Sequence, residues 1–176
     1  MCLRMHMQTI RAVVINYVMN GIPLLCHENE IFRTETGMVT NDYPNPKHWL
    51  AKLQQKYWAG QGHKVDGTLV ENDSIGNFRI IETPGHSAGH ISLFRERDGI
   101  LIIGDAATNM NLLTTVPGLG LPPKIFTSDQ QQNIRSLQKL AGLNPSMICF
   151  GHGPVMRNTD RKFEQFVAKC VWLFNL

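Results

Sequence analysis

The sequence lacks long apolar runs and stretches of one charge, and these absences exclude several classes of protein. No run approaches the roughly 18 consecutive apolar residues that a membrane-spanning helix needs. Lys and Arg occur singly and the formal net charge is only +3, so no basic surface for a nucleic acid is indicated. The N-terminus has no apolar segment of the signal-peptide kind. We therefore expect a cytoplasmic protein that binds neither nucleic acid nor a membrane.

The four cysteines lack the spacing of a disulfide framework or a CxxC zinc site. Cys2, Cys26, Cys149 and Cys170 stand far apart. Cys26 and Cys149 lie in apolar runs, which predicts buried free thiols. The chain has 176 residues, of which 43% are hydrophobic and 18% are charged. That balance is ordinary for one compact domain with a core, so we expect a single domain over residues 1–176.

The alternation of apolar and turn-forming residues predicts a mixed α/β sandwich. Strands are expected at 22–26, 68–70, 78–81, 90–94, 100–103 and 147–150, with a hairpin turn at 95–99. Helices are expected over 48–58, 128–142 and 159–168. Pro and Gly mark loops at 36–46 and 110–127. A loop as long as the second, within a compact domain, is often functional.

Three short motifs each follow a predicted strand and carry a side chain that can bind a metal. They are TPGHS at 83–87, GD at 104–105 and GHG at 151–153. Pro and Gly permit sharp reversals, so His86, Asp105 and His152 leave their strands in fixed directions. Histidine and carboxylate are ligand types that zinc prefers. Each motif alone is typical of a surface histidine or a turn, but the three together indicate a site.

The segments TPGHSAGHISLF, ILIIGDA and FGHGPV closely resemble the second half of metallo-β-lactamase-superfamily proteins. These are zinc-dependent hydrolases that include hydroxyacylglutathione hydrolase, N-acyl-homoserine lactonases and RNA-processing nucleases. The resemblance implies an αββα four-layer sandwich. It also implies that His86 binds one zinc, that Asp105 bridges two, and that His152 binds the second. By the same resemblance, His90 hydrogen-bonds near the turn and does not bind metal.

The family's upstream motif, HxHxDH, is only partly matched. Counting back from a Pro near the start of the following strand places the motif at residues 4–9, where His6 alone matches a ligand. Arg4, Gln8 and Thr9 would replace a His, the Asp that orients the attacking water, and a His. Alternatively, His6 is an N-terminal histidine with no role. The resemblance therefore implies an incomplete site with weak or partial zinc occupancy.

The same alignment affects the expected N-terminal structure. It makes residues 11–19 a helix, although Val and Ile at 11–18 favour a strand by propensity. The family also has strands before the HxHxDH motif, and this chain has three residues there, which is typical of a truncated or eroded member. We expect the neighbouring strand to expose an unpaired edge and apolar side chains. Self-association, as a homodimer, is therefore predicted.

Three functions remain open at this point. The first is a zinc-dependent hydrolase of a small-molecule ester, thioester or lactone, with His86, Asp105 and His152 as metal ligands. The second is a non-catalytic pseudoenzyme or fragment that retains the fold. The third is a nuclease of the same superfamily, which the modest net charge disfavours. The Leu, Val and Pro residues of the loop at 110–127 would either line a substrate site or cover the core.

Overall fold

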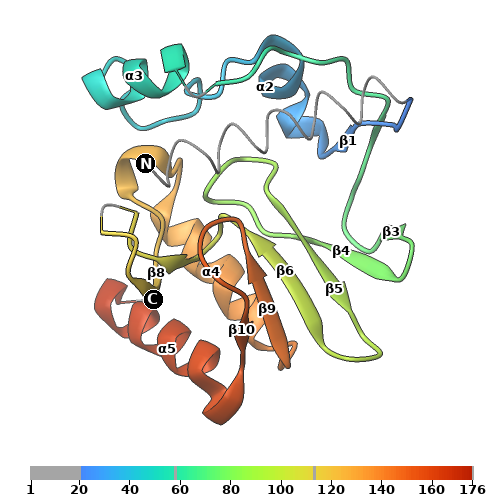
Figure 1. The fold of residues 1–176 in the computed structure, drawn as a ribbon, viewed down its shortest axis with the longest axis vertical. Coiled ribbons are helices and arrows are strands. Elements are labelled where there is room, and N and C mark those ends of the chain that lie inside the picture. Colours follow the sequence, from blue (N-terminus) through green and yellow to red (C-terminus); the bar gives the residue numbers. More distant parts are fainter. Residues whose placement is uncertain (1–20, 58, 113, 176) are drawn as a thin grey trace. The chain divides into compact units, whose positions relative to one another are not determined.

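The computed structural model describes residues 21–57, 59–112 and 114–175, which form two compact units, 21–69 and 70–175 (Figure 1). The predictions for His6 and for the replacements Arg4, Gln8 and Thr9 lie outside these residues, as does the helix expected at 11–19. The self-association that depends on this N-terminal region stays a prediction.

The first unit consists of two short strands and three helical segments. β1 (Leu25–Cys26) pairs in parallel with β2 (Gly67–Thr68), and between them lie η1 (Glu28–Glu30), α2 (Ile31–Thr36) and α3 (Trp49–Tyr57). The helix predicted at 48–58 is confirmed as α3. The six-residue α2 was not predicted; it ends at Gly37, whose φ of 69° suits a left-handed C-cap. A helix of six residues is too short to show an apolar periodicity in the sequence.

The second unit is built on a six-stranded sheet in the order β10-β9-β6-β5-β4-β3. The strands are β3 (Ser74–Ile75), β4 (Phe78–Glu82), β5 (Ile91–Arg95), β6 (Ile100–Gly104), β9 (Met147–Phe150) and β10 (Met156–Arg157). β4, β5 and β6 form an antiparallel meander, whereas β6 and β9 are parallel. The four main predicted strands and the hairpin turn at 95–99 are confirmed, and Gly99 donates its N–H to the Arg95 carbonyl at 2.9 Å.

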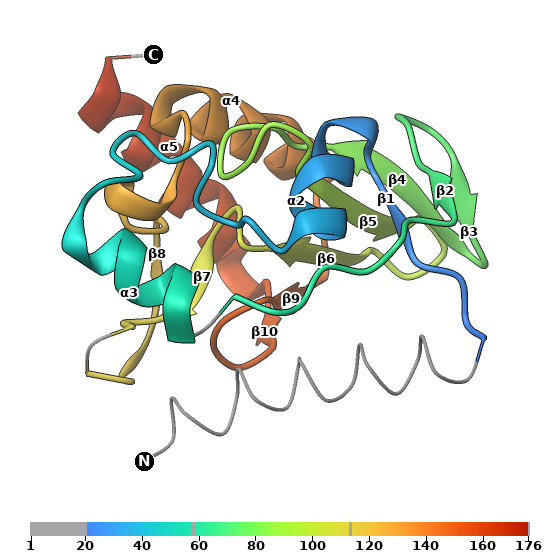
Figure 2. The same cartoon turned by 90° about the horizontal axis from the view of Figure 1, so that it is seen from above.

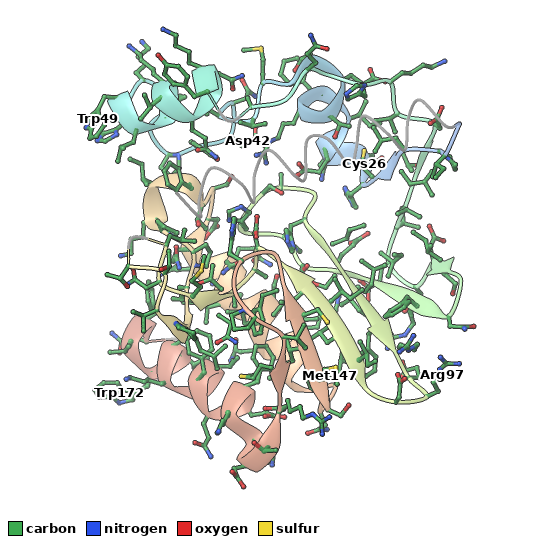
Figure 3. All side chains as sticks on the ribbon, viewed as in Figure 1. Cys26, Asp42, Trp49, Arg97, Met147 and Trp172 are labelled. Carbon is green, nitrogen blue, oxygen red and sulfur yellow. The ribbon has the colours of Figure 1, made fainter. Side chains whose placement is uncertain are left out.

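Two helices, α4 (Gln130–Ala141) and α5 (Lys162–Phe174), cover one face of this sheet (Figure 2). Side chains alternate between faces along a strand, so Leu101 and Ile103 of β6 are fully buried in the helix-facing core while Ile102 is only partly buried. α4 begins as predicted, because the Asp129 side chain accepts a hydrogen bond from the Gln132 N–H at 2.9 Å. Trp172 projects outward from α5 (Figure 3).

The final helix is longer than predicted. It follows η3 (Thr159–Arg161) and continues to residue 174 rather than 168, because Val167 and Cys170 extend its buried face. None of the helices in the described part of the chain has the length and apolar character that crossing a bilayer requires.

Two sequence-based predictions were wrong. The segment at 110–127 is not an open loop: β7 (Thr108–Met110) and β8 (Pro117–Gly120) pair as a hairpin, followed by η2 (Lys124–Phe126). Because β8 consists largely of Pro and Gly, its sequence resembles a loop and not a strand. Cys26 and Cys149 are free but only half-buried. Cys149 pairs with Ile102 in register, on the sheet face opposite the helical core, which accounts for its partial exposure.

A charged cluster joins α4 to the end of β4. The backbone N–H groups of Glu71 and Glu82 donate to each other's carboxylates, at 2.9 and 2.6 Å. Lys139 donates from Nζ to Glu71 Oε2 at 2.8 Å and to the Glu82 carbonyl at 3.1 Å. Burial opposes ionisation of Glu71, but the bonds from Lys139 and the Glu82 backbone, together with nearby positive charge, hold its pKa below the ordinary value. The cluster steadies the strand that leads to His86.

We predict that Glu71→Gln destabilises the protein by about 0.5 kcal/mol at pH 7, as expected for a partly exposed ion pair. A carboxylate with a lowered pKa contributes stability above its ordinary pKa of about 4.3 and loses it as the pH falls through the lowered value. The difference in the free energy of unfolding between the Glu71→Gln variant and the wild type should therefore vanish in acid. Urea unfolding at pH 7 and near pH 3 measures it. Glu96→Gln, which removes a more exposed ion pair with Arg79, is the control. If the stability difference is the same at both pH values, Glu71 does not have a lowered pKa in the folded protein.

Candidate metal centre

The sheet topology brings the predicted site residues to one edge. β4 and β6 are each antiparallel to β5 and therefore run the same way, and β9 is parallel to β6. The carboxyl ends of β4, β6 and β9 and the beginning of β5 consequently lie together. His86 follows β4, His90 precedes β5, Asp105 follows β6 and His152 follows β9. All four side chains start from the same edge of the sheet.

Asp105 and His152, two of the predicted ligands, lie close to each other. The Gly151 N–H donates to the Gly104 carbonyl at 2.8 Å, extending the parallel pairing past the strand ends. His152 Nε2 then lies 3.7 Å from Asp105 Oδ1. A Cβ on Gly151 would overlap this carboxylate oxygen, so only glycine at position 151 allows the Asp105 side chain to lie here. Asp105 Oδ1 is buried and has no hydrogen-bond partner among the described residues.

His90 supports the backbone of Asp105 and has both ring nitrogens engaged. The Asp105 N–H donates to His90 Nε2 at 3.2 Å, and Thr83 Oγ1 lies 2.8 Å from Nδ1. Because a backbone N–H can only donate, Nε2 is the acceptor and a neutral ring carries its proton on Nδ1. Thr83 is fully buried and bonds Ser92 Oγ at 3.0 Å. The hydrogen-bonding role expected for His90 is confirmed.

His86 lies on the turn between β4 and β5, which packs against the beginning of α4. Gly85 adopts φ 132°, and its carbonyl accepts from the Asp129 N–H at 2.8 Å, while the His86 carbonyl accepts from the Ser128 N–H at 3.1 Å. The His86 ring meets the His90 ring edge-on, with centroids 6.0 Å apart. The structure therefore brings His86 beside His90, whereas Asp105 and His152 form the contacting pair.

The Asp105–His152 pair fits two ligands of one cation. Ligands about 2.0–2.2 Å from a tetrahedral zinc lie roughly 3.3–3.6 Å from each other, close to the separation of the pair. A buried carboxylate oxygen without a hydrogen-bond donor is also a group that a cation would satisfy. Within residues 21–57, 59–112 and 114–175, however, no three His, Cys, Asp or Glu side chains gather tightly enough to hold a metal. The ligand roles of His86, Asp105 and His152 stay predictions.

Two side chains that hold the site in place were missed at the sequence level. The Asn109 N–H donates to the His152 carbonyl at 2.9 Å, and its amide Nδ2 donates to the Pro154 carbonyl at 2.9 Å. Thr83 carries the His90 ring, as described above. Neither residue belongs to a local pattern that distinguishes it from an ordinary turn or strand-end residue, so only the folded contacts reveal it.

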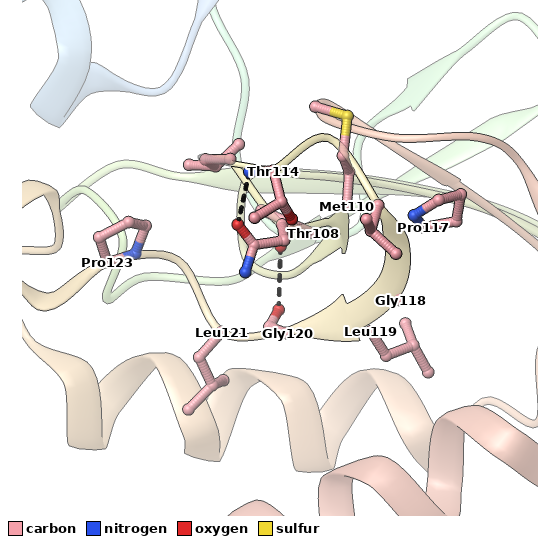
Figure 4. Close-up of a pocket in the computed structure, with 12 residues that line it drawn as sticks. Thr108, Met110, Thr114, Pro117, Gly118, Leu119, Gly120, Leu121 and Pro123 are labelled. Atoms are coloured by element: carbon pink, nitrogen blue, oxygen red, sulfur yellow. Dashed lines mark hydrogen bonds between the residues drawn. The ribbon is translucent and has the colours of Figure 1, made fainter.

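A cavity of about 600 Å³ lies along the β7–β8 hairpin (Figure 4). Thr108 and Met110, the neighbours of Asn109, are part of its lining, so the cavity begins one residue from the backbone bond to His152. Its apolar lining consists of Met110, Leu112, Val116, Pro117, Leu119, Leu121 and Pro123. Thr108, Asn111 and Thr114 add polar groups to the lining, and small-molecule sites commonly combine apolar walls with a few polar groups.

Comparisons with known proteins agree with this geometry. The sequence profile of the metallo-beta-lactamase superfamily matches residues 30–152. A probable metallo-hydrolase of Bacillus subtilis (strain 168), YflN, is 42% identical and covers 81% of this chain and 58% of its own length. An N-acyl homoserine lactonase of Bacillus thuringiensis is 30% identical over 56% of this chain and 40% of its own length. The protein belongs to the metallo-β-lactamase superfamily.

A solved structure of TTHA1623 in a di-iron-bound form has the same fold, with a TM-score of 0.55 at 21% identity. The match covers 83% of this chain and 65% of that one. The mixed α/β, metallo-β-lactamase-like fold is thus confirmed. The chain spans about three-fifths of the Bacillus subtilis relative's length, 58%.

We predict that Gly85→Ala destabilises the protein by about 2 kcal/mol or more, because the new Cβ would meet the backbone of Asn133 and φ at this position is positive. Gly118→Ala is the control, since no atom lies within 4 Å of its Cβ position and its φ is ordinary. The control should change stability by roughly 0.5 kcal/mol at most. Chemical unfolding compares the two, and similar midpoints would rule out the close packing of the His86 turn.

Proposed function

We propose that the protein is a metal-dependent hydrolase of small-molecule esters, thioesters or lactones. The observation that carries the proposal is the buried Asp105 Oδ1, which has no hydrogen-bond donor and lies 3.7 Å from His152 Nε2. His86 is proposed as a further ligand, supplied from the same sheet edge. Family membership and the similarity to a protein named N-acyl homoserine lactonase support the reaction class.

The chain's own residues would hold and orient the reacting groups. When bound, a divalent metal supplies Lewis acidity and lowers the pKa of a coordinated water towards about 7. Asp105 and His152 would hold the cation. His90 fixes the backbone N–H of Asp105, and Asn109 fixes the carbonyl of His152, so both ligands start from restrained backbone. Mutation of groups that hydrogen-bond to metal ligands commonly weakens metal binding about 10- to 100-fold.

Zinc is the ion we propose, at weak or partial occupancy. Imidazole and carboxylate ligands suit both zinc and iron, and the structural relative TTHA1623 is described with two irons. Elemental analysis of the protein dialysed after exposure to equal Zn²⁺ and Fe²⁺ distinguishes them. Retention of close to two zinc ions per chain would contradict the weak occupancy that the incomplete site implies.

We predict that Asp105→Asn and His152→Ala each weaken Zn²⁺ binding at least about tenfold and lower hydrolysis of a lactone or thioester by roughly 100-fold. His63→Ala is the matched histidine control, because its described hydrogen bond is made by the backbone N–H to the Thr34 carbonyl. Calorimetric titration and steady-state hydrolysis provide the two readouts. Wild-type zinc affinity and activity in Asp105→Asn would overturn the proposed site.

A non-catalytic domain is the second candidate, and one observation favours it. Within the described residues, no three His, Cys, Asp or Glu side chains gather tightly enough to hold a metal. Wild-type protein that neither retains zinc or iron nor hydrolyses any of the three bond classes would establish this alternative. The cavity along the hairpin would then have to serve binding alone.

The lining of that cavity supports a substrate with an apolar acyl portion. Met110 and Leu119 lie on the two paired strands of the hairpin, and Thr108 Oγ1 bonds the Gly120 carbonyl at 3.4 Å to close its base (Figure 4). Asn109 on the same strand donates its N–H to the His152 carbonyl, so the hairpin is joined to the loop that carries one of the proposed ligands. The hairpin is therefore proposed as the acyl-binding wall.

We predict that Leu119→Ser lowers kcat/KM for a long-chain acyl lactone roughly tenfold, the cost of losing contact with about two methylene groups. A short-chain lactone, which does not extend along the hairpin, should be hydrolysed as by wild type. Val155→Ser is the control, because Val155 is exposed and is not part of the lining. An equal loss for both chain lengths would mean that Leu119 does not contact the acyl chain.

A further inference from the structure

Asn133 is a fully buried amide on the core-facing side of α4. Its neighbour Ile134 and, one turn on, Leu137 are the apolar residues expected there, and both are fully buried. Asn133 Oδ1 has no hydrogen-bond partner in the described structure. Burying an unsatisfied amide oxygen is unfavourable, because the oxygen loses its hydrogen bonds to water and gains none in the protein. A leucine would avoid that cost, so the amide is expected to serve a purpose other than core stability.

The main chain of Asn133 meets the turn that carries His86. A Cβ built on Gly85 would overlap the backbone N and Cα of Asn133 and lie 2.7 Å from its Cβ. The same turn is held by the bond from the Asp129 N–H to the Gly85 carbonyl. Ser136, one helical turn further, donates from Oγ to the Pro84 carbonyl at 2.7 Å. The His86 turn therefore rests directly on α4 at Asn133.

The side chain of Asn133 meets the second turn of the site. Its Nδ2 donates to the Ala106 carbonyl at 2.8 Å, in a buried contact. Ala106 directly follows Asp105 and is itself fully buried. This bond fixes the peptide that leaves Asp105, while the His90 ring fixes the N–H that enters it. Asp105 is thus held on both sides.

We infer that Asn133 is a positioning residue that sets the His86 turn and the Asp105 turn at a fixed distance from each other. One residue touches both turns, the first through its main chain and the second through its amide. An apolar residue of similar size would preserve the packing against Gly85 and release the Ala106 carbonyl. This inference rests on the proposed metal site for its functional meaning, but the coupling between the two turns is a property of the chain without metal.

The test compares Asn133→Leu with Asn158→Leu in the full chain. Asn158 is a matched, partly buried amide whose Nδ2 donates to the Pro145 carbonyl and to Glu164 Oε2, both at 2.9 Å. It follows β10, and its N–H donates to the Ser146 carbonyl at 2.9 Å, beside the amino end of β9 and away from the carboxyl ends of the strands that carry the site. Both substitutions remove amide hydrogen bonds and should lower stability. A merely structural role for Asn133 would therefore give the two variants the same phenotype.

Two readouts separate positioning from stability. In ¹H–¹³C spectra of the metal-free protein, Asn133→Leu should shift the His86 and His90 imidazole signals, whereas Asn158→Leu should leave them at wild-type positions. Titration with Co²⁺ should show at least about tenfold weaker binding for Asn133→Leu only. Asn133→Ala, which adds no volume, should reproduce both effects if the leucine variant does not fold.

The inference is overturned if the Asn133 variants lose stability but keep wild-type imidazole signals. A wild-type protein that fails to bind Co²⁺ would count against the proposed hydrolase, and the imidazole signals would still decide the role of Asn133. Shifted signals together with unchanged Co²⁺ affinity would show that the turns are coupled but that the coupling does not reach the metal ligands, which also overturns the functional part of the inference.

Discussion

The parallel pairing of β6 with β9 is the constraint from which the candidate site follows. Gly104 is in register with Phe150, and the bond from the Gly151 N–H to the Gly104 carbonyl continues the pairing past both strands. Asp105 and His152 are therefore neighbours because their backbones are neighbours. The glycines on either side are required by the same closeness, since a Cβ on Gly104 would lie 2.8 Å from His90 Nε2. Side-chain chemistry at this edge depends on main-chain geometry.

Satisfied and unsatisfied polar groups are distributed unevenly in the second unit. Away from the site, Glu71, Glu82 and Lys139 satisfy one another through a closed set of hydrogen bonds. At the site, Asp105 Oδ1 and Asn133 Oδ1 are buried without partners among the described residues. Proteins generally tolerate such groups where a ligand or a required geometry compensates for them. The unsatisfied oxygens therefore mark the same edge that the sequence motifs indicate.

Much of the second unit could be predicted from the sequence, because its strands and α4 depend on local patterns. The unbroken apolar run of β6 and the Asp129 cap of α4 are examples. The β7–β8 hairpin could not, since Pro117, Gly118 and Gly120 resemble a loop until β7 supplies the partner strand. The predicted strand ends indicated where Asp105 and His152 emerge, but not that His152 Nε2 lies 3.7 Å from Asp105 Oδ1.

The contacts of His86 illustrate a different limit. Its turn is recognisable from TPGH, yet the direction of the turn depends on packing against a helix that begins more than forty residues later. Thr83, Asn109 and Asn133 have no sequence signature, because each acts through contacts with other segments of the folded chain. Such contacts depend on the complete tertiary structure and not on any segment of the chain.

The topology also has a consequence for how the protein folds. β4, β5 and β6 are joined by short turns and can pair early, since closing a short loop costs little chain entropy. β6 and β9 are about fifty positions apart in sequence, and parallel pairing over such a separation forms slowly. The Asp105–His152 pair is therefore assembled only when β9 joins the completed meander. Formation of that pair requires the β6–β9 pairing, and a chain arrested before it would contain the meander and the His90–Asp105 contact but not the Asp105–His152 pair.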